Sequence, residues 1–246
     1  MNTYQTAELA ALIGIHPNTV RLYEELGLIT KPERLANGYR RFTYLQLEQF
    51  QIARLAFQIE VLQNGLRKKI VQMVKVLATG DIDGALQLTQ EYLVSVRQEQ
   101  LHAEEAIETV HSILADEKNE SIHFLKRKEV SIFLDISTDT LRNWEMNGLL
   151  TVKRKQNGYR IYTDEDIKRL KIIRSLRCAN YSLDSILRML QQLSADPDVN
   201  IHKALDTPDI EEDIIAVCDK LITSLSNAEQ NAQTIIIKLQ KMEKTF

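Results

Sequence analysis

The sequence predicts a mainly α-helical protein in which one domain occurs twice, each time followed by a long helix. Only 8 Gly and 4 Pro occur in 246 residues, whereas a β-sandwich or barrel needs turn residues about every 8–12 positions. A pattern of residues recurs about 120 positions later, and two segments carry apolar residues at heptad spacing. The apolar fraction of 44% is too high for a disordered chain.

The repeat relates residues 7–29 to residues 128–150 at a constant offset of 121. The tetrapeptide Asn-Gly-Tyr-Arg at 37–40 recurs at 157–160, an offset of 120, so the loop of the second copy is one residue shorter. A period of this length is too long for a solenoid. The chain is therefore expected to contain two copies of one domain.

Each copy predicts a helix-turn-helix followed by a β-hairpin. In the first copy a short helix over 7–12 ends at Gly14, and a second begins at Pro17 and stops before Gly27. Asn37-Gly38 is a strong hairpin signal and predicts the wing of a winged helix-turn-helix. Further helices are expected at 44–59 and 64–77 and, in the second copy, at 164–179 and 183–192.

A heptad seam follows each copy. Apolar residues step by three and four along 225–242, and the pattern extends back to 214. The same spacing runs along 93–114, where Gln100 takes a core position of the kind that fixes register. The seams favour an extended coiled coil, and the alternative is an amphipathic helix packed on its own domain.

These signals set the expected domain boundaries. They are a first winged domain at 1–78, a connecting insert at 79–88, a first coiled-coil helix at 89–116, a linker at 117–123, a second winged domain at 124–195, a linker at 196–209 and a second coiled-coil helix at 210–246.

Charge is segregated along the chain, although the net charge is only −3. Residues 123–163 hold eight basic against four acidic residues, and 48–78 hold five against two. Residues 89–120 hold two basic against eight acidic residues. Basic winged units on acidic helices are the distribution expected of a protein that binds nucleic acid, here double-stranded DNA.

The candidate DNA-binding residues lie on the second helix and the wing of each copy. A recognition helix inserts its N-terminal residues into the major groove, where Asn18 can pair with adenine and Arg21 with guanine or phosphate. Wing residues follow the phosphate backbone. The first copy offers Pro17, Asn18, Thr19, Arg21, Tyr23, Tyr39, Arg40 and Arg41, and the second offers Thr138, Thr140, Arg142, Asn143, Trp144, Lys153, Arg154, Lys155, Tyr159 and Arg160.

Other roles stay open for several of these residues. Arg21 can be a solvated surface charge, and Tyr23 and Trp144 can belong to the core. Tyr39 and Tyr159 are expected to pack on their own helices and to leave the hydroxyl for phosphate. Asp139 can accept a hydrogen bond from cytosine, although its more favoured role is to cap the helix.

Several protein classes are disfavoured. There is no Gly-rich phosphate loop and no paired nucleophile and base, so we expect no enzyme and no catalytic residue. Cys178 and Cys218 stand alone, so we expect no metal site and no cofactor. No stretch of about 18 apolar residues predicts a membrane span, and the polar N-terminus is unlike a signal peptide. A cytoplasmic location is expected.

The first copy, A-E-L-A…G-I…N-T-V-R-L-Y-E…G-L-I…N-G-Y-R-R-F, closely resembles the winged DNA-binding domain of the bacterial MerR-type transcription regulators. The second, R-K-E-V-S-I-F-L-D-I-S-T-D-T-L-R-N-W-E-M-N-G-L-L…N-G-Y-R-I-Y, resembles it too. The resemblance covers 4–78 and 124–193, and the long helices match the family's dimerisation helix. It implies DNA contacts for Thr19, Arg21, Tyr23, Tyr39, Arg40, Thr140, Arg142 and Arg160.

The second copy departs from the family pattern, since Trp144 replaces the usual tyrosine. The turn between the last two DNA-binding helices, at 58–61 and at 179–182, lacks the usual glycine.

The resemblance implies dimers joined by an antiparallel pair of helices, which bind the overlong spacer of a promoter and distort it for RNA polymerase. Because this chain carries two units, we expect an intramolecular pseudo-dimer on unlike half-sites, and a homodimer is the alternative arrangement. The alternative function is a DNA-architectural or chromosome-anchoring protein. A small-molecule effector, if one exists, is expected at the coil, on the helical faces or at 79–88.

Overall fold

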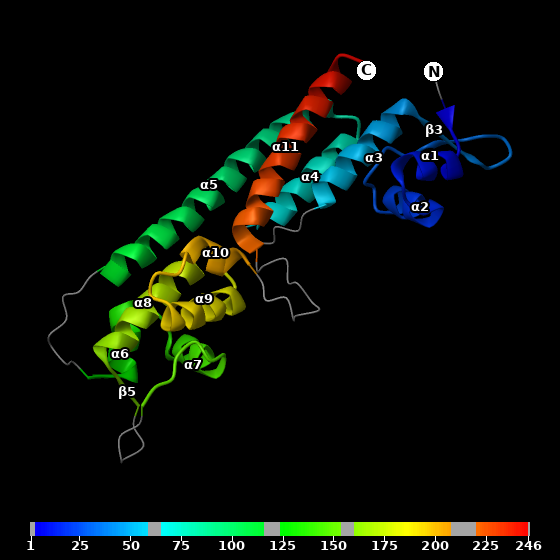
Figure 1. Cartoon of the computed structure of the whole chain (residues 1–246). Helices are drawn as coiled ribbons and strands as arrows, with labels where there is room; N and C mark the ends of the chain where they lie inside the picture. The colour runs from blue at the N-terminus through cyan, green and yellow to red at the C-terminus, as the bar shows by residue number, and fades with distance from the viewer. Residues whose placement is uncertain (1–2, 59–64, 116–123, 154–159, 208–219, 246) are drawn as a thin grey trace. The chain divides into compact units, whose positions relative to one another are not determined.

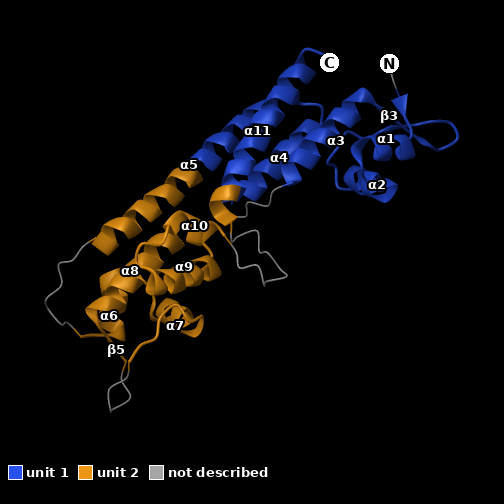
Figure 2. Ribbon diagram, viewed as in Figure 1, with its two compact units in different colours: residues 1–98, 224–246 blue, residues 99–223 orange. Residues whose placement is uncertain are grey.

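The computed structural model describes residues 3–58, 65–115, 124–153, 160–207 and 220–245 (Figure 1). The chain divides into two compact units, residues 1–98 with 224–246 (unit 1) and residues 99–223 (unit 2) (Figure 2). Both are mainly helical, and each contains one of the predicted winged helix-turn-helix copies. The fold class predicted from the sequence is therefore confirmed.

Unit 1 begins with the first winged helix-turn-helix. Its elements are β1 (Thr3–Tyr4), α1 (Thr6–Ile13), α2 (Pro17–Glu25), β2 (Glu33–Arg34), β3 (Arg40–Thr43), α3 (Tyr44–Phe57) and α4 (Leu66–Ala78). The strands form an antiparallel sheet in the order β1-β3-β2, with Tyr4 opposite Phe42 and Arg34 opposite Arg40. Gly38 supplies the positive φ of 81° that the hairpin turn requires.

Unit 2 contains the second copy. Its elements are β4 (Leu125–Lys126), α6 (Arg127–Leu134), α7 (Thr138–Met146), β5 (Ile161–Tyr162), α8 (Asp164–Cys178), α9 (Leu183–Ala195) and α10 (Ile201–Asp206). β4 pairs antiparallel with β5, and the Ile161 amide donates to the Lys153 carbonyl at 3.2 Å. The Asn157-Gly158 turn lies outside the described residues.

One helix is longer than the sequence predicted, and one further helix was not predicted. α5 spans Ile82–Ala115, so the insert expected at 79–88 is helical from Ile82 onward. Asp81 makes this start possible, because its carboxylate accepts from the Gly84 amide at 2.8 Å. The linker expected at 196–209 contains α10, which Asn200 caps and which buries Ile201 and Leu205.

α11 (Leu221–Glu243) packs on the other long helix and on the winged domain of the first copy, not on its own domain as the alternative expected. Its seam residues are at most 3% exposed; they are Leu225, Ala228, Ala232, Ile235, Leu239 and Met242. Arg97 of α5 pairs with Glu229 at 2.8 Å, and Tyr92 lines a small space together with Ala232 and Ile235, so the two helices run antiparallel. Residues 210–219 of the second coiled-coil helix expected from the sequence lie outside the described residues.

The winged domain on which α11 packs is that of the first copy. The side-chain amide of Asn231 on α11 donates to the Leu55 carbonyl of α3 at 3.2 Å. Lys238, also on α11, donates to the Gln51 side chain at 2.6 Å. In unit 2, residues 99–115 of α5 pack on the second winged domain, where Lys168 donates to the Leu114 carbonyl at 3.1 Å. Each winged domain is thus covered by a long helix that follows the other copy.

Candidate nucleic-acid interface

Helix α2 presents a polar face at its N-terminal end. His16 caps the helix by accepting from the Asn18 amide at 3.2 Å, and Pro17 occupies the first turn as predicted. Asn18 and Arg21 are exposed and hydrogen-bonded to each other at 3.3 Å, and Thr19 is half-buried beside them. These side chains share one surface and offer donors and acceptors of the kind that reads base edges.

Helix α7 presents the matching face of the second copy. Ser137 caps it by accepting from the Thr140 amide at 2.9 Å, so the expectation that Asp139 is the cap is wrong. Thr138, Asp139, Arg142 and Asn143 are exposed, and Thr140 is half-buried. Only the arginine and a threonine keep the same identity on both faces, so the two faces differ in chemistry.

Two aromatic candidates belong to the core. Tyr23 is 8% exposed and stacks on Phe50 with 5.0 Å between the ring centroids. Trp144 is 4% exposed. We therefore assign both rings to packing, because an α-helix buries one face and these positions share it with Val20 and Leu141.

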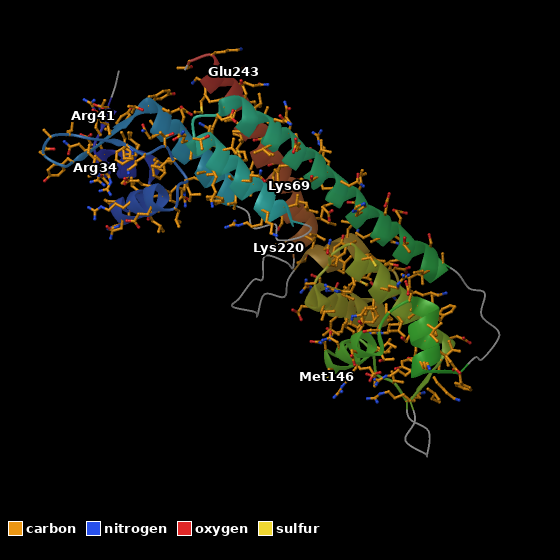
Figure 3. The ribbon with its side chains drawn as sticks, turned by 180° about the vertical axis from the view of Figure 1, so that it is seen from behind. Arg34, Arg41, Lys69, Met146, Lys220 and Glu243 are labelled. Carbon is orange, nitrogen blue, oxygen red and sulfur yellow. The ribbon has the colours of Figure 1, made fainter. Side chains whose placement is uncertain are left out.

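The hairpin of unit 1 carries exposed cations and one exposed ring. Arg41 pairs with Glu33 across β2 and β3, and Figure 3 shows Arg34 and Arg41 at this hairpin. Tyr39 was expected to pack on its own helix, but it is 66% exposed. On the second wing Lys153 is exposed, and Arg154, Lys155 and Tyr159 lie outside the described residues.

A glutamate joins the recognition helix to the wing in each copy. Arg40 donates through Nε to Glu24 of α2, and the Nε of Arg160 forms an ion pair with Glu145 of α7 at 2.8 Å. Neither glutamate was among the residues predicted from the sequence. Their recurrence at the offset of 121 is the signal that could have found them.

Glu145 is the more heavily hydrogen-bonded of the two. Arg127 donates to both of its oxygens at 2.9 and 3.0 Å, and the Tyr162 hydroxyl donates at 2.7 Å. Burial opposes the charged form, but the hydrogen bonds from Arg127 and Tyr162 and the charge of Arg160 outweigh it, so the pKa of Glu145 is held below its ordinary value.

This lowered pKa predicts an acid-sensitive contribution to the stability of unit 2. Ionised Glu145 stabilises the folded state above its ordinary pKa of 4.5, and the contribution is lost as pH falls through the lower folded pKa. Urea midpoints measured from about pH 7 to about pH 3 are expected to fall less steeply for Glu145→Gln than for the unaltered chain. Glu165→Gln, on an exposed position of α8, is the control, and equal pH profiles for all three proteins would contradict the assignment.

The comparisons with known proteins match both winged domains. A model described as MerR family regulatory protein matches residues 5–42, and one described as MerR HTH family regulatory protein matches residues 126–193. The two matches support a MerR-type regulator with two MerR-like units. Together with the relatives, they support a DNA-binding transcription regulator.

Several curated relatives of this MerR-type chain are bacterial regulators. The HTH-type transcriptional regulator ZntR of Escherichia coli K12 is 28% identical over 108 residues, which are 44% of this chain and 74% of the relative. The regulator CueR of Escherichia coli O6:H1 is 38% identical over 53 residues, 22% of this chain and 39% of the relative. The mercuric resistance operon regulatory protein of Bacillus cereus is 45% identical over 40 residues, 16% of this chain and 30% of the relative. No solved structure matches.

The described residues contain neither a candidate metal cluster nor a candidate membrane span. Among the described residues, no group of three or more His, Cys, Asp or Glu side chains is placed to hold a metal ion. None of the described helices combines the length and apolarity needed to cross a membrane.

Proposed function

We propose that this MerR-type chain regulates transcription as an intramolecular pseudo-dimer that binds the overlong spacer of a promoter. One observation supports the proposal most strongly. α11, which follows the second copy, packs on the first winged domain, and residues 99–115 of α5, which follows the first copy, pack on the second. A homodimer would supply that second helix from another chain, whereas here both helices belong to one polypeptide. RNA polymerase is the proposed functional partner, and an effector, where one acts, is proposed to bind at the long helices.

The two recognition faces support an operator with unlike half-sites. Asn18 and Arg21 lie at the start of α2, while Asp139, Arg142 and Asn143 lie along α7. Base edges in the major groove are distinguished by donor and acceptor patterns, so different side chains select different bases. The proposed DNA contacts are therefore Pro17, Asn18, Thr19, Arg21, Tyr39, Arg40 and Arg41 in one half and Thr138, Thr140, Arg142, Asn143, Lys153, Arg154, Lys155, Tyr159 and Arg160 in the other.

Arg21→Ala and Arg142→Ala are expected to weaken protection of different halves of one footprint. Loss of a base or phosphate contact costs about 1–3 kcal/mol, so each variant should bind roughly tenfold or more weakly. The operator is first identified from a genome-wide binding map, and footprints and affinities are then measured on it. Lys241→Ala, on an exposed position of α11, is the matched control and should bind normally.

Two results would overturn parts of this proposal. Uniform binding to unrelated sequences would favour an architectural or chromosome-anchoring protein over a regulator of a specific promoter. A stable dimer in light scattering at working concentration would replace the pseudo-dimer by a homodimer with four winged units.

A further inference from the structure

A glutamate near the C-terminal end of each recognition helix occupies the same position in both copies. Glu24 belongs to α2 and Glu145 to α7, and each forms an ion pair with the Nε of a wing arginine. The glutamate side chains are only 8% and 10% exposed, while those of Arg40 and Arg160 are 21% and 31% exposed. The carboxylates are therefore shielded, and part of each guanidinium reaches the surface.

The same atom of the arginine lies nearest the glutamate in both copies. Arg40 and Arg160 each use Nε, and within the described parts of the chain their Nη groups make no hydrogen bond. A guanidinium is a rigid planar fork, so fixing Nε also fixes the direction of the two Nη groups. That fork matches the geometry of a phosphate group.

The remaining partners of the two glutamates differ between the copies. Glu145 is also bound by Arg127 and Tyr162, whereas Thr6 and Phe42 stand at the corresponding positions of the first copy. There the second cation is Arg34, whose Nη2 lies 3.7 Å from Glu24. The bond to the wing arginine is therefore the part of the arrangement that both copies retain.

We propose that Glu24 and Glu145 are positioning residues of the DNA interface, which hold the wing arginines so that their Nη groups meet backbone phosphates. The inference rests on the proposed DNA-binding role of Arg40 and Arg160. It adds that each arginine acts only when a glutamate of the neighbouring recognition helix orients it. The wing and the recognition helix then engage DNA as one rigid element.

A double-mutant cycle on the full chain tests this coupling. Affinity for the mapped operator is measured at several salt concentrations for Glu24→Ala, Arg40→Ala and the double variant. Arg40→Ala is expected to bind about tenfold more weakly and to reduce the salt slope by about 0.9, the loss of one phosphate contact. Glu24→Ala should lose a similar factor, and the double variant should be no weaker than Arg40→Ala alone.

Further variants separate positioning from folding. Glu229→Ala breaks the Arg97 ion pair on the long helices of the same unit and should leave operator affinity unchanged. Arg40→Lys keeps the charge but removes the fork, so it should weaken binding while circular-dichroism melting stays normal. This variant tests the inference even where Glu24→Ala fails to fold.

Three outcomes would overturn the inference alone. Glu24→Ala that is folded and binds as tightly as the unaltered chain shows that the glutamate does not orient Arg40. The same conclusion follows if the two losses add in the double variant or if Arg40→Lys binds normally. An unaltered chain that binds no DNA overturns the proposed function as well, which distinguishes the two failures.

Discussion

Replacing Ile235 by aspartate is expected to destabilise unit 1 by about 4 kcal/mol or more, because it buries a charge that has no partner. Ile235 is 0% exposed and lines a small space between four helices together with Leu55, Ile70 and Tyr92. No basic residue lines this space, so nothing there can neutralise the new carboxylate. The expected readout is a large fall in the urea midpoint of unit 1 followed by circular dichroism.

Ile237→Asp is the matched control for this variant. Ile237 lies two residues further along α11 but is 68% exposed, so the same substitution should change stability by no more than about 0.5 kcal/mol. Because all four helices around Ile235 belong to one chain, the loss should not depend on protein concentration. A stable Ile235→Asp variant would show that α11 does not pack on the first winged domain in solution.

The local elements of the winged domains could be predicted from the sequence because short-range signals determine them. Pro17 fits only the first turn of α2, and Gly14 and Gly38 adopt positive φ at the turns where they were expected. Asp135 takes the place of Gly14 in the second copy and adopts a φ of 50°, a conformation that aspartate tolerates. α8 begins with a capping box of Thr163 and Asp166, a short-range pattern that the sequence itself contains.

The start of α5 and the short helix α10 could not be predicted, because their sequences carry weak or misleading helix signals. A connecting insert was expected at 79–88, but Asp81 accepts from the Gly84 amide at the start of α5. A β-carbon at position 84 would lie 2.3 Å from an Asp81 carboxylate oxygen, so the glycine there makes room for the cap. α10 has six residues, too few to show a helical period.

The candidate site was predicted only where exposure follows from helix periodicity. Arg21 and Arg142 are exposed on their helices, but the pairs Glu24–Arg40 and Glu145–Arg160 join residues 16 and 15 positions apart. Such contacts depend on how the hairpin folds back onto the helix, and sequence spacing alone does not give that geometry. The seams likewise predicted that each long helix needs an apolar partner but did not identify α3 as one.

Replacing Trp144 by alanine is expected to destabilise unit 2 by about 3–5 kcal/mol, the usual cost of removing a large buried aromatic ring. Trp144 is 4% exposed, and Leu141 on the same face of α7 is fully buried. The chain has one Trp, so its fluorescence reports unfolding of unit 2 in the unaltered protein, while circular dichroism follows the alanine variant. Met146→Ala is the control on the same helix, since Met146 is 76% exposed and lies at the end of α7 (Figure 3).

Trp144→Phe then distinguishes a packing role from a DNA contact. Phenylalanine retains an apolar ring but is smaller and lacks the indole N–H, so a packing residue should lose about 1–3 kcal/mol of stability. Folded Trp144→Phe should bind the operator within about twofold of the unaltered chain, because the loss of a real DNA contact costs about 1–3 kcal/mol. The opposite result, normal stability with a tenfold loss of affinity, would place the indole at the DNA surface and reverse its assignment to the core.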